Sequence, residues 1–468
     1  MNPVAPSAPA SESPALEQVL GDALGRSERD AEFVAITLQA PSLPAEAFLS
    51  GIRDDLLAFA PPAGFECAGI GVCASVVGSG PERFALVERR AEALFGRISS
   101  VGAGAPAQAP RLLGGFAFQV GRAESALWNA FGEARFVLPR LLYTRNSAAA
   151  TLSLCVRREE LERQASRRSL GLELEHALAR LSAQTASAAR LPQVRGWSPA
   201  AALGGEGALD WVSSVQAIRR EIESGRLEKV VLARRVELDL GELPEAAQVL
   251  SRLRAQAPEC TRFVLRTAEH TFVGAAPERL VKKQGSAFET EAVAGSMKAE
   301  EPLVASRLLE SEKDLLEHEM VVRGIVAALA PIAAELDYPR RPELHRLRHV
   351  LHLRTPIRGR LLGSAHVLSL VERLHPTPAV GGLPSDAALA WIAAHEPDER
   401  GWYAGPIGWF DAAGDGEFVV ALRSGVLADR RAHLYVGAGI VQGSVPLEEF
   451  AETQWKLAAL SGALGVKP

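Results

Sequence analysis

The chain has 468 residues, of which 47% are hydrophobic and 23% are charged. This composition is typical of a folded soluble protein and argues against a disordered, collagen-like or membrane-embedded chain. The net charge of −5 gives no overall attraction to nucleic acid or to an anionic membrane, so an anionic ligand needs local positive charge or a metal ion. No apolar run of about 18 residues is present, and we expect a cytoplasmic protein without membrane or nucleic-acid partners.

Two stretches of small and helix-breaking residues divide the chain. Residues 1–20 begin with MNPVAPSAPASESPA, which lacks the basic and apolar regions of a signal peptide and predicts a disordered tail. The stretch Ala183–Leu209 is weakly periodic and predicts a linker or surface crossing between an N-terminal part, residues 21–200, and a C-terminal part, residues 201–468. The cysteines lack CxxC spacing and are expected to be free thiols: Cys67, Cys73, Cys155 and Cys260.

The N-terminal part contains strand-like runs followed by a polar helical stretch. Strands are expected at Phe33–Leu38, Leu112–Val120 and Ala149–Arg157. A helix is expected over Glu159–Ala183. Because this part contains few clusters of acidic and basic side chains, we expect it to act mainly as a scaffold.

The C-terminal part begins with a helix over Trp211–Ser224, closed by Gly225, and a β-branched run LEKVVLARRVELDL that predicts a strand. Further strands are expected at Thr261–Thr267, His270–Gly274, Phe418–Leu427 and His433–Val436. Further helices are expected at Ala305–Ala334, Ser364–Leu374, Ser385–His395 and Leu447–Leu464. Strands interleaved with helices, without strict βαβ alternation, favour an α+β fold with large antiparallel sheets.

One expected helix, within ESEKDLLEHEMVVRGIVAAL, carries two acids on a face that becomes apolar one turn later. Asp314 and Glu317 are three residues apart and share this face. Acids on a face that becomes buried usually have a partner, although acids at a helix start also complement the helix dipole. The stretch HEMVV lacks the second histidine of HExxH, which excludes that zinc site.

The last expected helix, within SVPLEEFAETQWKLAAL, carries further charges on one face. Ser444 is its expected N-cap, and Glu449, Glu452 and Lys456 line up along the helix. Glu452 and Lys456 also fit an ordinary exposed ion pair. Two carboxylates from separate helices, with no His or Cys cluster beside them, suit magnesium, which takes one or two protein carboxylates, several waters and substrate ligands.

Two further motifs exclude other classes of protein. YVGAGIVQG has Gln442 where a GxGxxG dinucleotide motif needs its third glycine, which argues against a dinucleotide-dependent oxidoreductase. Gly437 and Gly439 instead let an anion approach backbone N–H groups. The basic segment HRLRHVLHLRTPIRGR has aliphatic residues at alternating positions and indicates a strand with one solvated face rather than a nucleic-acid groove.

Lys229 stands at the head of the expected strand EKVVLAR. A charged lysine is costly in a buried strand. Its side chain therefore either extends to solvent or loses its proton and serves as a base.

In combination, these motifs resemble the chorismate-utilising enzymes, and most closely the isochorismate synthases. The resemblance covers roughly residues 210–465, and the N-terminal part carries no comparable motif. Each motif alone can arise by chance, but the ordered set is specific. In chain order the motifs are EKVVLARR, FVGAAPERL, EAVAGS, SEKDLLEHEMVV, VLHLRTPIRG, HPTPAVGGLP, ERGWYAGPIGW, ALRSG, VGAGIV and EEFAETQWK.

The resemblance implies a four-layer αββα sandwich to which both parts of the chain contribute sheets. It implies that Glu317 and Glu452 hold Mg²⁺, which bridges to the substrate carboxylate, with Asp314 and Glu449 nearby. The remaining residues that it implies for substrate binding are Gly295, Ser296, His352, Tyr403, Arg423, Gly437, Gly439 and Lys456.

Lys229 decides which branch of the family the chain resembles. In the branches that add water to chorismate an equivalent lysine is the general base, whereas the anthranilate-forming branch, which uses ammonia from a glutaminase, typically lacks it. The aminodeoxychorismate-forming branch often has a nucleophilic lysine where this chain has Ala294. The resemblance thus implies an isomerase in which Lys229 activates water for attack at C2 of chorismate, while protonated Glu278 donates to the departing C4 hydroxyl.

The finer assignment rests on loop motifs. HPTPAVGGLP resembles isochorismate synthases more than salicylate synthases. Total length and ERGWYAGPIGW favour the menaquinone type, with a siderophore-pathway isochorismate synthase or a salicylate synthase as alternatives. No glutaminase subunit is expected, and the protein is expected to be a monomer or homodimer. The family motif Gly-Thr-Arg-Pro-Arg is replaced by Gly295-Ser296-Met297-Lys298, which keeps the hydroxyl but raises the question of how this loop is held.

Overall fold

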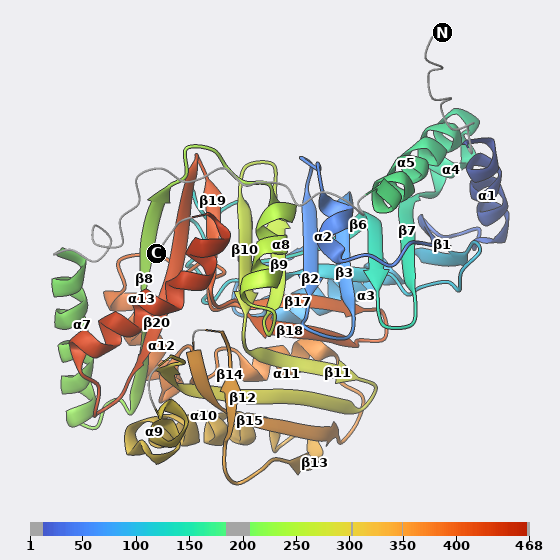
Figure 1. Ribbon diagram of the computed structural model, residues 1–468. Coiled ribbons are helices and arrows are strands. Elements are labelled where there is room, and N and C mark those ends of the chain that lie inside the picture. Colours follow the sequence, from blue (N-terminus) through green and yellow to red (C-terminus); the bar gives the residue numbers. More distant parts are fainter. Residues whose placement is uncertain (1–12, 184–205, 301–302, 349, 466–468) are drawn as a thin grey trace.

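The computed structural model describes residues 13–183, 206–300, 303–348 and 350–465 (Figure 1). The N-terminal half comprises α1 (Ser13–Arg26), β1 (Phe33–Gln39), α2 (Ala45–Leu49), β2 (Leu56–Ala60), β3 (Glu66–Gly78), α3 (Arg83–Phe95), β4 (Ile98–Gly102), β5 (Arg111–Phe116), β6 (Ala134–Arg145), β7 (Ala150–Arg157), α4 (Arg158–Glu162) and α5 (Gln164–Ala183).

The C-terminal half comprises α7 (Glu206–Glu223), β8 (Lys229–Asp239), α8 (Ala246–Gln256), β9 (Thr261–Arg266), β10 (Thr271–Ala276), β11 (Arg279–Gln284), β12 (Ala287–Lys298), α9 (Val304–Glu310), α10 (Glu312–Leu329), β13 (Ala333–Asp337), β14 (Glu343–Arg346), β15 (Val350–Leu361), α11 (Val367–Leu374), β16 (Gly382–Leu383), α12 (Ser385–His395), β17 (Pro406–Asp411), β18 (Gly416–Val420), β19 (Ser424–Ala428), β20 (Arg431–Ile440) and α13 (Pro446–Ala463).

The strands form two paired runs that meet at the long strand β6. One run has the order β16-β8-β20-β19-β10-β9-β2-β3-β6-β7-β1-β4. The other has the order β15-β12-β11-β18-β17-β5-β6, with β13 and β14 on the outer edge of β15. Among the described residues every pairing is antiparallel except β1 with β4. Because β2 pairs with β9 and β5 pairs with β17, both halves of the chain supply strands to both runs.

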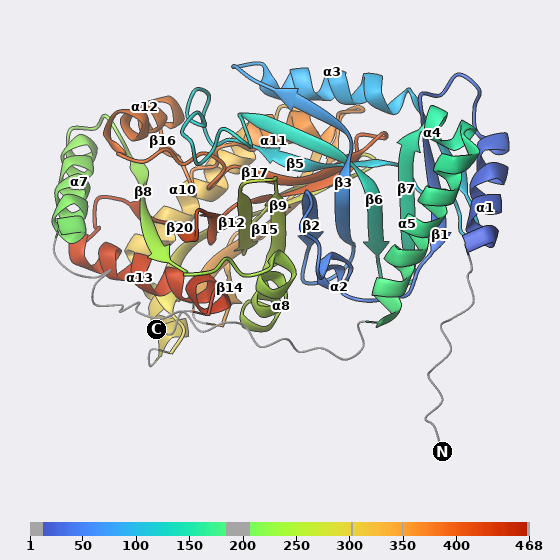
Figure 2. The same cartoon turned by 90° about the horizontal axis from the view of Figure 1, so that it is seen from above.

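Helices cover the two outer faces of the strand layers (Figure 2). α2, α8 and α13 lie on one side and α3, α10 and α11 on the other, so the α+β fold class with large antiparallel sheets is confirmed. One core cluster joins strands from both runs through buried rings such as Phe136, Phe272 and Phe418. A second core cluster packs α1, α2, α5, α8 and α13 against the outer face of the strands.

Some expected elements differ from the observed ones in the C-terminal half. The expected strand Phe418–Leu427 is two strands, because Arg423 has a φ of 49° and interrupts the ladder between β18 and β19. The expected helix Ala305–Ala334 forms α9, breaks, forms α10 and then turns into β13. The break occurs because the Ser311 side chain accepts a hydrogen bond from the Asp314 backbone N–H and so caps a new helix.

In the N-terminal half, the expected strands Phe33–Leu38 and Ala149–Arg157 are confirmed as β1 and β7. The expected strand Leu112–Val120 ends earlier, at Phe116. The expected helix Glu159–Ala183 is divided between α4 and α5 at Arg163, whose backbone is extended.

The two expected unstructured stretches are only partly within the described residues. Residues 1–12 lie outside them, and α1 begins at Ser13, within the expected tail. Residues 184–205 of the expected linker also lie outside them, and α7 begins at Glu206. All four cysteines are free thiols. None of the helices in the described part of the chain has the length and apolar character needed to span a lipid bilayer.

Candidate active site

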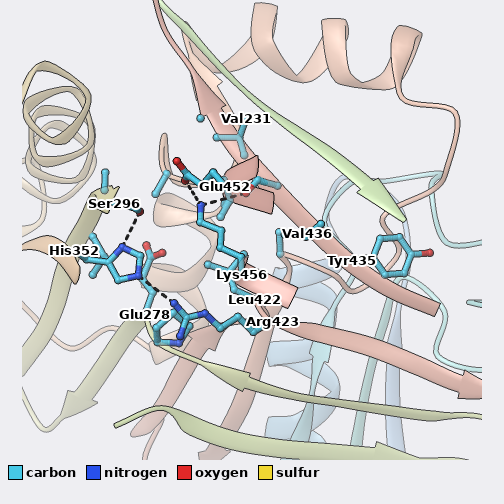
Figure 3. Close-up of a pocket in the computed structure, with 18 of the residues that line it drawn as sticks. Val231, Glu278, Ser296, His352, Leu422, Arg423, Tyr435, Val436, Glu452 and Lys456 are labelled. Atoms are coloured by element: carbon cyan, nitrogen blue, oxygen red, sulfur yellow. Dashed lines mark hydrogen bonds and ion pairs between the residues drawn. The ribbon is translucent and has the colours of Figure 1, made fainter. Parts of the chain in front are cut away.

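A pocket lies where β8, β12 and β20 meet α10 and α13, and most of the expected site residues surround it (Figure 3). These residues come from segments that are far apart in the sequence, so the fold brings them together. The expected residues that line it are Glu278, Gly295, Ser296, Glu317, His352, Tyr403, Arg423, Gly437, Gly439, Glu452 and Lys456.

Lys229 points into this region rather than to solvent. Its side chain is 0% exposed, and its Nζ lies 2.8 Å from Glu317 Oε1 on α10. A Cβ atom built on Gly439 would lie 2.3 Å from that same Oε1 and 3.0 Å from Lys229 Cε. Gly439 is therefore required for the close approach of the lysine and the carboxylate, in addition to any role in binding an anion.

Glu278 is a buried acid in the loop between β10 and β11. It is 2% exposed, and among the described residues its Oε1 has no hydrogen-bond partner. Burial, followed by the charge of Glu291, raises the pKa of Glu278 to about 8, against the opposing effect of Lys229. The carboxyl is therefore mainly protonated at neutral pH and can donate a proton into the pocket.

A chain of polar contacts crosses one wall of the pocket (Figure 3). Arg423 Nη2 lies 3.1 Å from His352 Nε2, and His352 Nδ1 lies 2.8 Å from Ser296 Oγ. Burial, followed by the charges of Arg423 and Lys456, lowers the pKa of His352 well below its usual value, so the ring is neutral. Since arginine only donates, Nε2 accepts and Nδ1–H donates to Ser296, which leaves the Ser296 hydroxyl proton for another acceptor.

Tyr403, Gly437 and Lys456 also line the pocket. Tyr403 is buried and stacks on Tyr435 with ring centroids 5.3 Å apart. A Cβ on Gly437 would lie 3.3 Å from the Tyr403 hydroxyl, so the glycine leaves room for this ring. Lys456 Nζ is 2.5 Å from Glu452 Oε1 and 3.3 Å from the Gly437 carbonyl oxygen. The ion pair expected from the i,i+4 spacing is therefore present, but it lines the pocket.

The predicted carboxylates of α10 and α13 form one charged cluster. Lys313 Nζ lies 2.5 Å from Glu449 Oε1, and this carboxylate is 2% exposed. Burial, followed by repulsion from Glu452, raises the pKa of Glu449 to about 7. Burial also raises the pKa of Asp314, with Glu317 adding to the shift. In contrast, Lys229 and other lysines outweigh the effect of burial on Glu317 and hold its pKa below the usual value.

The start of α13 differs from the expected one. Its N-cap is Val445, not Ser444, and no side chain caps it. Ser444 is instead buried, and its hydroxyl accepts a hydrogen bond from the Val441 N–H, which closes the turn between β20 and the helix.

The donor set of this cluster fits a hard divalent cation. No group of three or more His, Cys, Asp or Glu side chains in the described part of the chain is arranged to hold a metal ion. Glu317 and Glu452 nevertheless both line the pocket, where Glu317 pairs with Lys229 and Glu452 with Lys456. Two protein carboxylates with space for water and an anionic ligand suit magnesium.

Sequence reasoning missed other features of the site. Arg400 is buried and lines the pocket. It is the one basic residue of ERGWYAGPIGW, and an arginine among glycines and aromatic residues was the available signal. The departure after Ser296 lies in strand β12 and not in a loop as expected, because Met297 and Lys298 pair with Leu351 and Val350 of β15. Met297 also packs against a small apolar cluster that includes Val304 and Leu353, so strand pairing and apolar packing hold this segment.

A family model described as chorismate binding enzyme matches residues 15–465. The chain belongs to the chorismate-binding enzyme family. The match extends across both halves, which agrees with the strand pairing between them.

Similar members of this family are isochorismate synthases. The salicylate biosynthesis isochorismate synthase of Pseudomonas aeruginosa is 37% identical over 84% of this chain and 82% of its own length. The isochorismate synthase MenF of Bacillus subtilis is 36% identical over 76% of this chain and 75% of its own length. The structure of the menaquinone-specific isochorismate synthase MenF of Escherichia coli aligns with a TM-score of 0.76 and 26% identity, covering 97% of this chain and 100% of that one.

Proposed function

We propose that this protein is a magnesium-dependent isochorismate synthase, an isomerase that moves a hydroxyl function from C4 to C2 of chorismate. The observation that carries the proposal is that a protonated Glu278 lines the same pocket as Glu317, whose carboxylate contacts the buried Lys229 Nζ at 2.8 Å. In this proposal the Lys229 amine serves as the base and the neutral Glu278 carboxyl as the acid. The isochorismate synthases similar to most of the chain support the same assignment.

The reaction balances with one water entering and one leaving. Lys229 accepts a proton from water as the water oxygen bonds to C2 of chorismate, and the ring double bonds shift. The C4–O bond breaks as Glu278 donates its proton to the departing hydroxyl, which leaves as water. Glu317, 2.8 Å from Lys229 Nζ, orients the amine. Glu278 regains a proton and Lys229 loses one before the next turnover.

Other residues would bind the substrate. We propose that Arg423, Tyr403 and the backbone at Gly437 and Gly439 bind the enolpyruvyl carboxylate, because together they combine positive charge with glycines that allow close approach. Ser296, with its hydroxyl proton free, can donate to the substrate. Lys456, His352 and Gly295 complete the enclosure.

We propose that Glu317 and Glu452 hold Mg²⁺, with Asp314 and Glu449 supporting them. When bound there, the ion would neutralise and position the ring carboxylate of chorismate. This placement also accounts for a dense group of carboxylates beside a pocket that takes an anionic substrate.

The direct test is product analysis by NMR or chromatography after incubating the purified protein with chorismate and Mg²⁺, with and without EDTA. Isochorismate that forms with Mg²⁺ and fails to form with EDTA is the expected result. Salicylate together with pyruvate would assign the protein to the salicylate synthases. Conversion that requires ammonia would contradict both the water-adding reaction and the absence of a glutaminase partner.

A first variant tests the role of the lysine. Lys229→Ala should lower kcat by about 10²–10⁴-fold, because it removes the general base. Lys282→Ala on β11, where the side chain is 40% exposed, is the matched control and should keep wild-type turnover. A Lys229→Ala protein that folds normally and turns over chorismate at the wild-type rate would refute this role.

We propose menaquinone synthesis as the use of the product, which the alignment with the menaquinone-specific enzyme of Escherichia coli supports. The relative from Pseudomonas aeruginosa favours salicylate formation as the alternative. Deleting the gene should remove menaquinone from the producing cell, and supplying isochorismate synthase activity should restore it. A deletion strain that keeps menaquinone but loses salicylate would decide for the alternative.

A further inference from the structure

A buried ion pair lies at the edge of the pocket, where its arginine is part of the lining, and takes no part in the proton transfers described above. Glu396 is the C-cap residue of α12, and Arg400 follows four residues later. Both side chains are 3% exposed. Arg400 Nε donates to Glu396 Oε2 at 2.8 Å and Nη2 donates to Oε1 at 2.6 Å. A buried pair of this kind costs desolvation unless further hydrogen bonds satisfy it.

Those further bonds go to the edge of β8, the strand that begins with Lys229. One edge of β8 pairs with β20 along most of its length. The other edge pairs with β16 only at Lys229 and Val230, and the Val231 N–H then donates to the Gly381 carbonyl at 2.9 Å. After Val231, no further strand pairs with this edge of β8 in the described part of the chain. Instead, the Ala233 N–H donates to Glu396 Oε1 at 2.8 Å, and Arg400 Nη2 donates to the Val231 carbonyl at 2.6 Å.

The arginine also reaches the loop on the other side. Its Nη1 donates to the Val380 carbonyl at 2.8 Å, and its guanidinium stacks 4.3 Å from the centre of the Phe118 ring. Val231, Val380 and Arg400 all line the pocket. The ion pair therefore substitutes for a missing strand and joins the lysine-bearing strand to the loop that forms the neighbouring wall.

We propose that Glu396 and Arg400 are positioning residues that fix β8, and with it Lys229, against the wall of the pocket. The proposal rests on the proposed function, because the position of Lys229 matters for the attack of water on chorismate. Four Arg400 N–H groups are engaged with protein atoms, so the pair acts through β8 and the Val380 loop and not by moving a proton.

Two conservative variants test the pair. Arg400→Lys keeps the charge but loses the planar fork, and one ammonium cannot reproduce four directed hydrogen bonds. Glu396→Gln keeps the shape but places an NH₂ group against a donor of Arg400. Both should lower kcat by about 10–100-fold with KM within about threefold of wild type, because a small displacement of a reacting group slows chemistry more than binding. The double variant should be no slower than the slower single variant, since the two residues act as one unit.

Arg254→Lys is the matched control. Arg254 on α8 also forms a multiple ion pair, with Glu46 Oε1 at 2.6 Å and Glu66 Oε1 at 3.0 Å, and none of these three residues lines the pocket. This variant should lower the melting temperature and leave kcat unchanged. It therefore separates general loss of stability from loss of positioning.

Amide hydrogen exchange supplies a readout that needs no substrate. In Arg400→Lys and Glu396→Gln, exchange should rise in residues 230–233 and 379–383 and stay at the wild-type level elsewhere. Arg254→Lys should leave these two segments unchanged.

The outcomes separate this proposal from the proposed function. Wild-type protein that does not convert chorismate would overturn the proposed function itself. An active wild type whose Arg400→Lys and Glu396→Gln forms keep kcat within about threefold would overturn the positioning role alone. A fall in kcat that Arg254→Lys reproduces, with exchange raised over the whole chain, would also overturn it.

Discussion

At the scale of single residues, the sequence identified side chains but not their protonation states. GAAPE marks Glu278 as a candidate acid. Burial and the charge of Glu291 keep it protonated. Glu291 lies on β12, more than ten residues further along the chain, and the fold brings it close to Glu278. Similarly, the sequence left two readings of Lys229 open. The structure excludes extension to solvent, because the lysine is fully buried against Glu317 on a helix from another part of the chain, and its use as a base belongs to the proposed function.

The raised pKa of Glu278 gives a prediction on pH and activity. With a pKa of about 8, the acid loses its proton above that pH, so kcat should fall in the alkaline range. Glu278→Gln should lower kcat by about 10²–10⁴-fold at neutral pH, because the amide cannot donate a proton to the leaving hydroxyl. Glu289→Gln on the neighbouring strand β12, 47% exposed, should keep wild-type kcat. A wild-type kcat that stays level to about pH 10 would contradict the assignment.

The raised pKa of Glu278 also gives a prediction on how the stability of the protein depends on pH. The folded pKa of Glu278 lies above its ordinary value of 4.5, so the folded state holds its proton more tightly than the unfolded state between 4.5 and about 8. Its contribution to the free energy of unfolding is therefore complete below this window and is lost as pH rises through it. Urea unfolding at several pH values should show a smaller decline for Glu278→Gln than for wild type. Equal declines would show that Glu278 titrates normally.

At the scale of elements, the spacing of charges on two helices predicted much of the carboxylate cluster. Asp314 and Glu317 on α10 and Glu449 and Glu452 on α13 share faces as expected from helical periodicity. The sequence indicated only one of their lysine partners. Lys456 is the i,i+4 neighbour of Glu452, whereas Lys313 on α10 pairs with Glu449 on α13. Contacts within one helix can be read from the sequence, but contacts between helices depend on packing.

The carboxylates of α10 and α13 give a prediction on magnesium binding. By calorimetry in the absence of substrate, Glu317→Gln and Glu452→Gln should each weaken Mg²⁺ binding by at least about tenfold, because a site with two protein carboxylates loses one of them. Glu448→Gln is the matched control, since this acid lies on the exposed face of α13. Circular dichroism checks that each variant is folded. Wild-type affinity in both pocket variants would mean that magnesium binds elsewhere.

At the scale of the whole molecule, local patterns predicted strands well but not their partners. β1, β7 and β8 follow from β-branched, apolar runs of the sequence. The pairing of β2 with β9 and of β5 with β17 joins segments that lie roughly 200 to 300 residues apart, and no local pattern specifies such contacts. The described residues on the two sides of the expected linker therefore interleave their strands, which only the resemblance to the family had implied.

This interleaving gives a prediction on fragments. Residues 206–468 produced alone should fail to form the native sheet, because β9 and β17 lose their partners β2 and β5 and the rings of Phe272 and Phe418 lose their contacts with Trp128 and Phe136. Co-production with residues 1–205 should restore a soluble complex that converts chorismate. The intact chain should unfold in one cooperative transition by calorimetry. Two separate transitions, or an active fragment 206–468, would instead mean that the catalytic half folds as an independent domain.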